Sequence, residues 1–289
     1  MIALTVVLAV LIGLSLGLLG GGGSILTVPL LVYVTGLPAK EAIALSLLVV
    51  GVTSAAAAVS HARAGRVQWR TGILFGLAGM VGAYAGGRLA ELIPGRILLL
   101  AFAVMMVATA IAMLRGRKDV DPDAAPRRLP LGRILLDGTV VGLVTGLVGA
   151  GGGFLVVPAL ALLGGLPMPV AVGTSLVVIA MKSAAGFAGY LASVQIDWTL
   201  AAMVTAAAVV GSVLGGRLVS RVHPEHLRKG FGWFVLVMAT VILGQELGWL
   251  VGGVAAALVA GAAVVVVLRG RRRRPAPAAA PAEPVASER

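Results

Sequence analysis

Two clusters of glycine are the residues of this chain whose type and spacing best suit the binding of a ligand. Each cluster interrupts an apolar stretch and precedes a short segment that ends at a proline. Glycine lets the backbone turn tightly, and the N–H groups at the start of the following helix carry partial positive charge, so two such turns predict an anion site. Close helix packing through small residues is the alternative interpretation. The predicted site residues are Gly20, Gly21, Gly22, Gly23 and Ser24 in the first element and Gly149, Gly151, Gly152 and Gly153 in the second.

One lysine, Lys182, lies well inside a further apolar stretch. If that stretch spans a membrane, the cation costs about 2.5 to 3.5 kcal/mol unless it is paired or hydrated, and such charges are commonly retained for function. Lys182 could bind an anion directly or change its protonation state, whereas snorkelling or contact with a helix C-terminus would be structural roles. Hydroxyl groups that could donate hydrogen bonds to an anion complete the predicted binding residues, although serine and threonine also pack helices. They belong to Ser46, Thr174 and Ser175.

The other polar residues do not form a constellation for catalysis or for metal binding. The chain has no cysteine, which excludes disulfides and thiolate chemistry. His223 and His226 lie in a basic segment with one carboxylate, Glu225, between them, which is a poor metal-binding set. The sequence also lacks a P-loop, a nucleophile elbow and a dinucleotide fingerprint. It therefore predicts no catalytic residue, no metal, no cofactor and a protein that is not an enzyme.

The glycine clusters belong to an internal duplication. Shifting the sequence by 129 positions places the first cluster on the second and keeps its flanks in register without a gap. Pro29 falls on Pro158 and Trp69 on Trp198, whereas Lys182 falls on Thr53. Two apolar halves with a break at matching positions are typical of secondary transporters, in which the broken segments mark the substrate site.

Composition indicates that these halves lie in a lipid bilayer. Hydrophobic residues make up 59% of the chain and charged residues 12%, and the mean hydropathy is +1.05. A soluble surface needs more charge than this, and apolar stretches of about 20 residues can each span a membrane as a helix. We therefore predict an all-α, polytopic membrane protein with roughly eight to eleven membrane segments. The apolar stretches cover residues 2–35, 41–60, 71–91, 95–114, 134–164, 168–192, 198–219, 228–245 and 247–268.

The organisation along the chain follows from these stretches. Residues 1–114 form the first membrane repeat and residues 133–245 the second, joined by a polar linker at 115–132. Residues 247–268 form an additional membrane segment that has no counterpart in the first half. Residues 269–289 form a basic, alanine- and proline-rich tail that we expect to be disordered.

The distribution of basic residues predicts the orientation of the two repeats. The formal net charge of +12 is concentrated in the linker, the tail and a few loops, which favours the positive-inside rule over nucleic-acid binding. With the linker and the C-terminus in the cytoplasm, equivalent loops of the two repeats face opposite sides. The repeats are then inverted, and each glycine-broken segment enters and returns to supply the odd crossing. A parallel arrangement with one long tilted helix per segment is the alternative.

The residues around the two clusters resemble a known family. Leu18 to Pro29 and Gly146 to Pro158 are similar to the paired G-x-G-G-G-x-x-x-x-P elements of the TauE/SafE family of sulfite and organosulfonate exporters, and Gly173 to Leu176 also fits. The resemblance covers nearly all of residues 1–245 but not the last segment or the tail. It implies transport of small anions such as sulfite or sulfoacetate and leaves the substrate open, because members with different substrates share these elements.

The sequence thus predicts a secondary transporter, expected to be an exporter, of small sulfur-containing anions across the cytoplasmic membrane. Its partners are the anion and the lipid bilayer, with no nucleic acid. Protons as the coupling ion and a homo-oligomeric state are left open. A passive anion channel and an accessory scaffold subunit without transport of its own remain the alternative functions.

Overall fold

A computed structural model describes residues 2–19, 24–115, 131–149, 168–218 and 224–248, together with the single positions 156, 157, 160, 166, 253, 254, 257, 261 and 264. All regular structure in these residues is helical, which confirms the predicted all-α class. The first half contains α1 (Ile2–Leu19), α2 (Thr27–Tyr33), α3 (Ala39–Arg63), α4 (Trp69–Leu89), the 3₁₀ turn η2 (Ala90–Leu92) and α5 (Gly95–Arg115). The second half contains α6 (Leu131–Val148), α8 (Met168–Tyr190), α9 (Trp198–Leu218) and α10 (Pro224–Leu247).

Proline and glycine set the helix ends. Pro38 takes the N-cap position of α3, where a missing N–H is not needed. Four glycines with positive φ follow the ends of α2, α3, α6 and α10, a conformation that only glycine adopts without strain. They are Gly36, Gly65, Gly149 and Gly248. α6 ends at Val148, where the second glycine cluster begins, and the first long apolar stretch is divided between α1 and α2, on either side of the first cluster.

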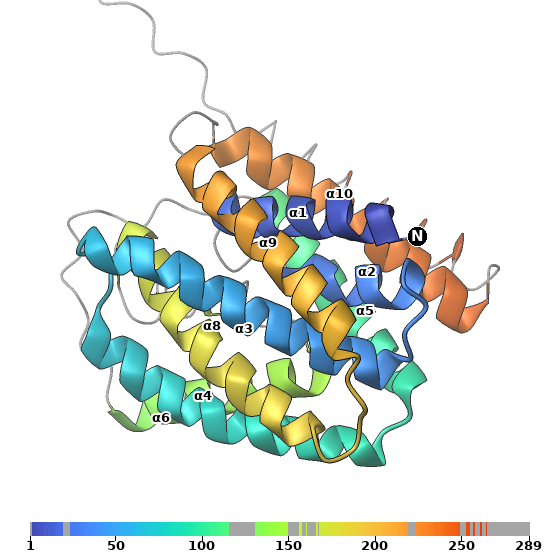
Figure 1. Cartoon of the computed structure of the whole chain (residues 1–289), viewed down its shortest axis with the longest axis horizontal. Helices are drawn as coiled ribbons and strands as arrows, with labels where there is room; N and C mark the ends of the chain where they lie inside the picture. The colour runs from blue at the N-terminus through green and yellow to red at the C-terminus, as the bar shows by residue number, and fades with distance from the viewer. Residues whose placement is uncertain are drawn as a thin grey trace, which may run out of the picture.

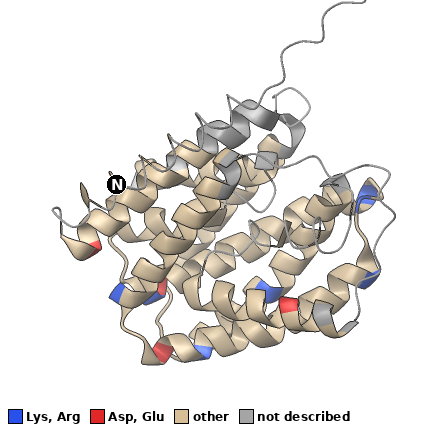
Figure 2. Cartoon of the chain, turned by 180° about the vertical axis from the view of Figure 1, so that it is seen from behind, with Lys and Arg blue, Asp and Glu red and all other residues tan. Residues whose placement is uncertain are grey.

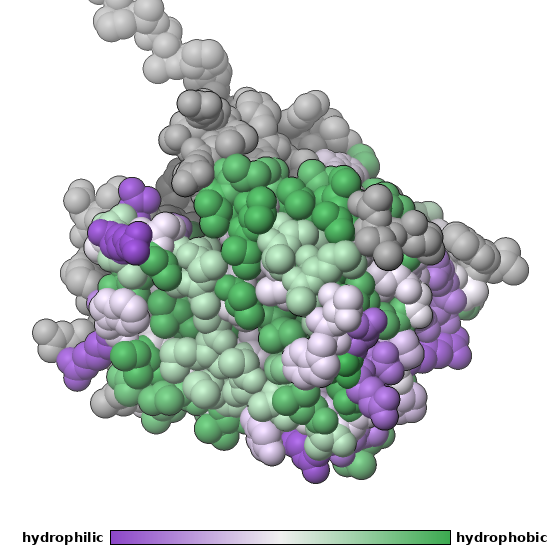
Figure 3. All heavy atoms as spheres, in the orientation of Figure 1, coloured by the Kyte–Doolittle hydropathy of each residue, from purple (hydrophilic) through white to green (hydrophobic). Residues whose placement is uncertain are grey.

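The helices have the length and composition of membrane spans. Four reach membrane length: Ala39–Arg63, Trp69–Leu92, Val170–Tyr190 and Trp198–Gly215. The described parts of five shorter apolar helices accompany them, including Ser24–Tyr33, which follows the first cluster. Figure 3 shows one face of the bundle that is apolar across its middle, with hydrophilic residues gathered toward opposite ends. Such a face is expected for a protein surrounded by lipid.

The centre of the bundle is the pair α3 and α8, which lie side by side (Figure 1). A methyl group placed on Gly51 would lie 3.3 Å from Ser183 Cβ, and one on Gly186 would lie 3.3 Å from Leu47 Cδ1. From Leu47 to Gly51 the residue numbers of α3 increase, while those of the contacted residues of α8 decrease from Gly186 to Ser183. The two helices are therefore antiparallel. Around this pair, α4 packs against α6 and α8, α1 against α9, and α5 against α10.

Close contacts between the two halves have counterparts between the residues that are equivalent under the shift of 129 positions. A methyl group on Gly82 would lie 2.0 Å from the Thr139 carbonyl oxygen, and one on Gly211 would lie 2.1 Å from the Val10 carbonyl oxygen. Adding 129 to Gly82 gives Gly211, and subtracting 129 from Thr139 gives Val10.

The same exchange relates Gly142, against Gly79, to Gly13, against Ala208. A contact set that is preserved on exchange is the property of a two-fold relation. Because the equivalent helices α3 and α8 are antiparallel, these contacts support inverted repeats, and the sidedness in a membrane stays a prediction.

Candidate functional site

The most unusual side chain in the interior is Lys182, which is 1% exposed. It extends from α8 and its Nζ donates a hydrogen bond to Thr145 Oγ1 on α6 at 3.0 Å. Thr145 Oγ1 donates in turn to the Val141 carbonyl oxygen at 2.7 Å, which leaves its lone pairs for the ammonium. Gly79 of α4 faces the lysine stem, because a methyl group there would lie 3.6 Å from Lys182 Cβ. The lysine side chain therefore lies among α4, α6 and α8.

The positive charge of Lys182 has no carboxylate partner in the part of the chain that the structure describes. The two ion pairs found there, Arg88–Glu91 and Arg96–Glu246, are elsewhere. Figure 2 shows how few charged positions these helices carry and that most lie toward helix ends. An ammonium has three N–H donors, and Thr145 takes one. A buried cation without a charged partner is costly, and either loss of its proton or binding of an anion removes that cost.

The end of α6 lies next to this lysine. Gly149 has φ +72 and ends the helix, and its carbonyl oxygen accepts a hydrogen bond from Ser46 Oγ of α3 at 2.9 Å. The Leu147 carbonyl oxygen accepts one from the Tyr190 hydroxyl at 2.7 Å. Helix C-termini carry partial negative charge, which favours a cation near this end. Lys182 contacts α6 through the Thr145 side chain, and the described residues show no hydrogen bond from its ammonium to a terminal carbonyl oxygen of α6.

The predicted site residues fall into three groups. Ser46 and Gly149 are joined by a hydrogen bond at the end of α6, and Lys182 is bound to Thr145 one turn earlier in the same helix. Thr174 and Ser175 lie eight and seven positions before Lys182, about 10 to 12 Å along the axis of α8. Thr174 Oγ1 accepts a hydrogen bond from the Gln68 backbone N–H, and Ser175 Oγ donates to the Val172 carbonyl, so in this structure both serve local structure.

The third group is the glycine clusters. Ser24 is fully buried at the turn that leads into α2. The rest of this group lies outside the described residues, so its geometry as an anion site stays a prediction. These residues are Gly20, Gly21, Gly22, Gly23, Gly151, Gly152 and Gly153.

Thr145 and Tyr190 are site residues that the sequence analysis missed. Thr145 lies one turn before Gly149, in the same apolar stretch, and is 1% exposed. Tyr190 is fully buried at the last residue of α8. A hydroxyl one turn before a glycine break is a signal that could have pointed to Thr145. The hydrogen bond from Tyr190 to Leu147 depends on how α8 crosses α6, and a local sequence pattern does not predict that crossing.

Comparison with known proteins finds a family match over the two predicted repeats. The family model described as "Sulfite exporter TauE/SafE" matches residues 5–242. A "Probable membrane transporter protein" of Xylella fastidiosa (strain Temecula1) is 35% identical over 83% of this chain and 94% of its own length. A protein with that description from Methanocaldococcus jannaschii is 28% identical over 84% of this chain and 93% of its own length. One from Bacillus subtilis is 27% identical over 83% of this chain and 99% of its own length. No solved structure matches the chain.

Proposed function

The chain belongs to the TauE/SafE family of membrane transporters, and from that premise we propose that it moves small sulfur-containing anions, such as sulfite or organosulfonates, out of the cell. It does so as a secondary transporter in the cytoplasmic membrane, with its C-terminus in the cytoplasm. Transport rather than catalysis is the activity of the family, and the described residues hold no group of three or more potential metal ligands.

The observation that carries this proposal is the fully buried Lys182. Its ammonium lies among α4, α6 and α8, bound to one neutral hydroxyl. Binding of one anion replaces an unpaired buried charge by a charge-assisted hydrogen bond, which is stronger than a neutral one. A single lysine, without an arginine fork, fits a small anion that is held by one or two oxygens.

The break at the end of α6 gives this site a means of opening. Ser46 belongs to the first half and Gly149 to the second, so their hydrogen bond links the halves at the site. Movement of one half against the other would change this contact and the surroundings of Lys182 together. Alternating access of this kind is how inverted-repeat transporters expose one site to each side in turn.

The membrane potential is sufficient to drive export of a monovalent anion. An inside-negative potential favours efflux by about 2.3 kcal/mol per charge per 100 mV. Export therefore needs no coupling ion, whereas uptake would need one. This reasoning supports export over import and makes proton coupling unnecessary for a monovalent substrate.

Flux measurements in proteoliposomes test the proposal. Purified protein is reconstituted, and sulfite, sulfate, thiosulfate, sulfoacetate and taurine are loaded and compared against protein-free vesicles. The proposal predicts saturable flux of at least one sulfur-containing anion that responds to an imposed potential. Flux that does not saturate would identify a passive channel. Absence of flux for every anion would favour a scaffold role and refute the proposal.

A further inference from the structure

A cavity lies at the end of the bundle where α3 and α5 begin and where α8 connects to α9. Its volume is about 450 Å³. Its charged lining residues are Lys40 and Glu41 at the start of α3, and Ser193 and Gln195 add polar groups from the α8–α9 loop. The loop carries no basic residue, and the positive-inside rule places it outside the cell. The cavity is therefore on the predicted outer face.

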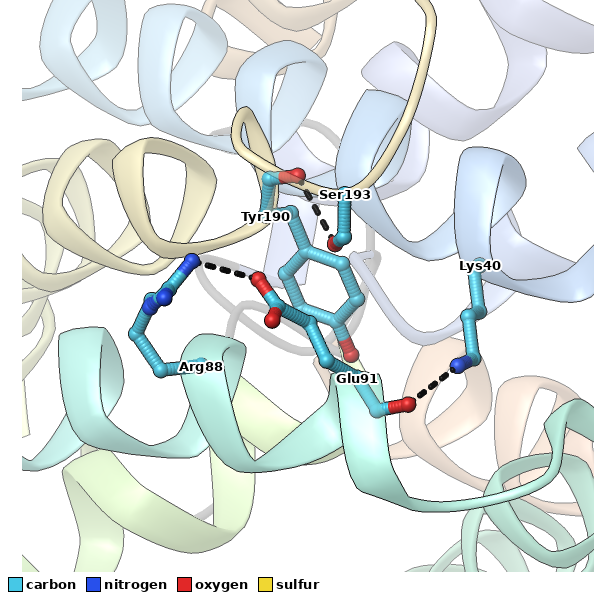
Figure 4. A network of polar contacts seen from close by, with 5 residues as sticks. All are labelled: Lys40, Arg88, Glu91, Tyr190 and Ser193. Atoms are coloured by element: carbon cyan, nitrogen blue, oxygen red, sulfur yellow. Dashed lines mark hydrogen bonds and ion pairs between the residues drawn. The ribbon is translucent and has the colours of Figure 1, made fainter.

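The charges around the cavity leave Lys40 without a carboxylate partner. Lys40 Nζ donates to the backbone carbonyl oxygen of Glu91 at 2.9 Å, whereas the Glu91 carboxylate pairs with Arg88 at 2.5 Å (Figure 4). Glu41 lies in the first turn of α3, where the helix end offsets part of its negative charge. Lys40 and Glu41 are thus the two lining charges without an ion-pair partner among the described residues, and an approaching anion would be attracted by the first and repelled by the second.

Tyr190 makes hydrogen bonds to the cavity wall and to the last turn of α6. Ser193, which lines the cavity, donates a hydrogen bond through Oγ to the Tyr190 carbonyl oxygen at 3.1 Å. Tyr190 (Figure 4) is fully buried, and its hydroxyl donates a hydrogen bond to the Leu147 carbonyl oxygen in the last turn of α6. That turn also carries Thr145, the partner of Lys182. Tyr190 is therefore bonded through its backbone to a residue of the cavity wall and through its hydroxyl to the turn of α6 that holds Thr145.

We propose that this cavity is an outer vestibule for the transported anion, that Lys40 attracts the anion there, and that Tyr190 is the barrier between the vestibule and Lys182. The proposal rests on the proposed anion transport and adds its outer binding place. The ligand class is a small anion with oxygen atoms that can accept hydrogen bonds from an ammonium and a hydroxyl.

Lys40 and Glu41 are adjacent residues of opposite charge, so their neutral variants form a matched pair for a flux experiment. In vesicles with defined orientation, Lys40→Gln should lower the initial rate at low outside sulfite about three- to tenfold, because the attracting charge is lost. Glu41→Gln should raise that rate about twofold or more, and both effects should shrink at high salt. Arg63→Gln, at the opposite end of α3, is the control for net charge and should leave the outside rate unchanged. Equal changes of the same sign in Lys40→Gln and Glu41→Gln, or no change in either, would overturn the vestibule.

A second test needs no transport. Because the chain has no cysteine, Ser193→Cys supplies one thiol in the cavity wall. The rate of its reaction with an impermeant anionic methanethiosulfonate is divided by the rate with a cationic one. This ratio should be about fivefold higher in Ser193→Cys than in the double variant Ser193→Cys, Lys40→Gln. An unchanged ratio would refute the role of Lys40 even if sulfite flux is normal. A changed ratio without flux of any anion would keep the charged cavity and refute the proposed transport instead.

Discussion

Replacing Gly82 or Gly211 by alanine should destabilise the protein by equal amounts, because the two positions make equivalent contacts in the two halves. A methyl group on Gly82 would lie 2.0 Å from the Thr139 carbonyl oxygen, and one on Gly211 would lie 2.1 Å from that of Val10. Ordinary contact begins near 3.4 Å, so α4 and α6, or α9 and α1, must separate by about 1.4 Å. Backbone atoms cannot rotate away as a flexible side chain can.

The expected magnitude follows from two opposing effects. Overpacking of a filled contact costs about 1 to 3 kcal/mol. Alanine regains up to about 1 kcal/mol of helix propensity over glycine. We expect each variant to lose about 1 to 2 kcal/mol of unfolding free energy.

Unfolding of the purified protein in detergent, followed by tryptophan fluorescence during titration with a denaturing detergent, measures this loss. Gly79→Ala is the matched control, since its methyl group would lie 3.6 Å from the Gly138 oxygen and from Lys182 Cβ, at ordinary contact distance. It should be neutral or slightly stabilising. A large loss in only one of Gly82→Ala and Gly211→Ala would refute the two-fold equivalence of the halves. A similar loss in Gly79→Ala would refute the steric reasoning.

Three further predictions concern the site and the topology. Thr145→Val should reduce anion flux about three- to tenfold while the protein stays folded, because Lys182 loses its described hydrogen-bond partner, and wild-type flux in this variant would contradict that role. Gly22→Leu and Gly151→Leu should each abolish flux, since a side chain would fill the space that a ligand or backbone needs, and normal flux in both would show that the clusters are dispensable. A cysteine at Val194 should react with an impermeant maleimide in intact cells and one at Gly65 should not, because basic residues flank Gly65 but not Val194. Equal labelling of the two cysteines would indicate parallel repeats.

The sequence alone was sufficient for the fold class and for the breaks in the helices. Apolar stretches of membrane length predict helices directly, α6 ends where the second glycine cluster begins, and α1 and α2 lie on either side of the first. The internal shift of 129 positions also pairs Gly82 with Gly211 before any contact is known. These features are local in the chain or repeat along it, so a pattern can report them.

The surroundings of Lys182 could be predicted only in part. Its depth in an apolar stretch marks it as unusual, but the partner Thr145 comes from a different helix, 37 positions earlier. Thr174 and Ser175 share a stretch with Lys182, yet the rise of a helix keeps them about 10 to 12 Å away along its axis. Which hydroxyls meet the lysine depends on the crossing of α6 and α8, and that crossing is a property of the packed bundle.

The central claim is that Lys182 binds the transported anion, and potential-driven sulfite flux through Lys182→Ala measures it most directly. Vesicles with equal amounts of wild-type and variant protein are compared over a range of sulfite concentrations, after both proteins have been shown to be folded and inserted. Loss of a buried charge-assisted hydrogen bond, about 1.5 to 3 kcal/mol, predicts a fall of about ten- to a hundredfold in flux at low sulfite. Wild-type flux at every concentration in the alanine variant would contradict the account.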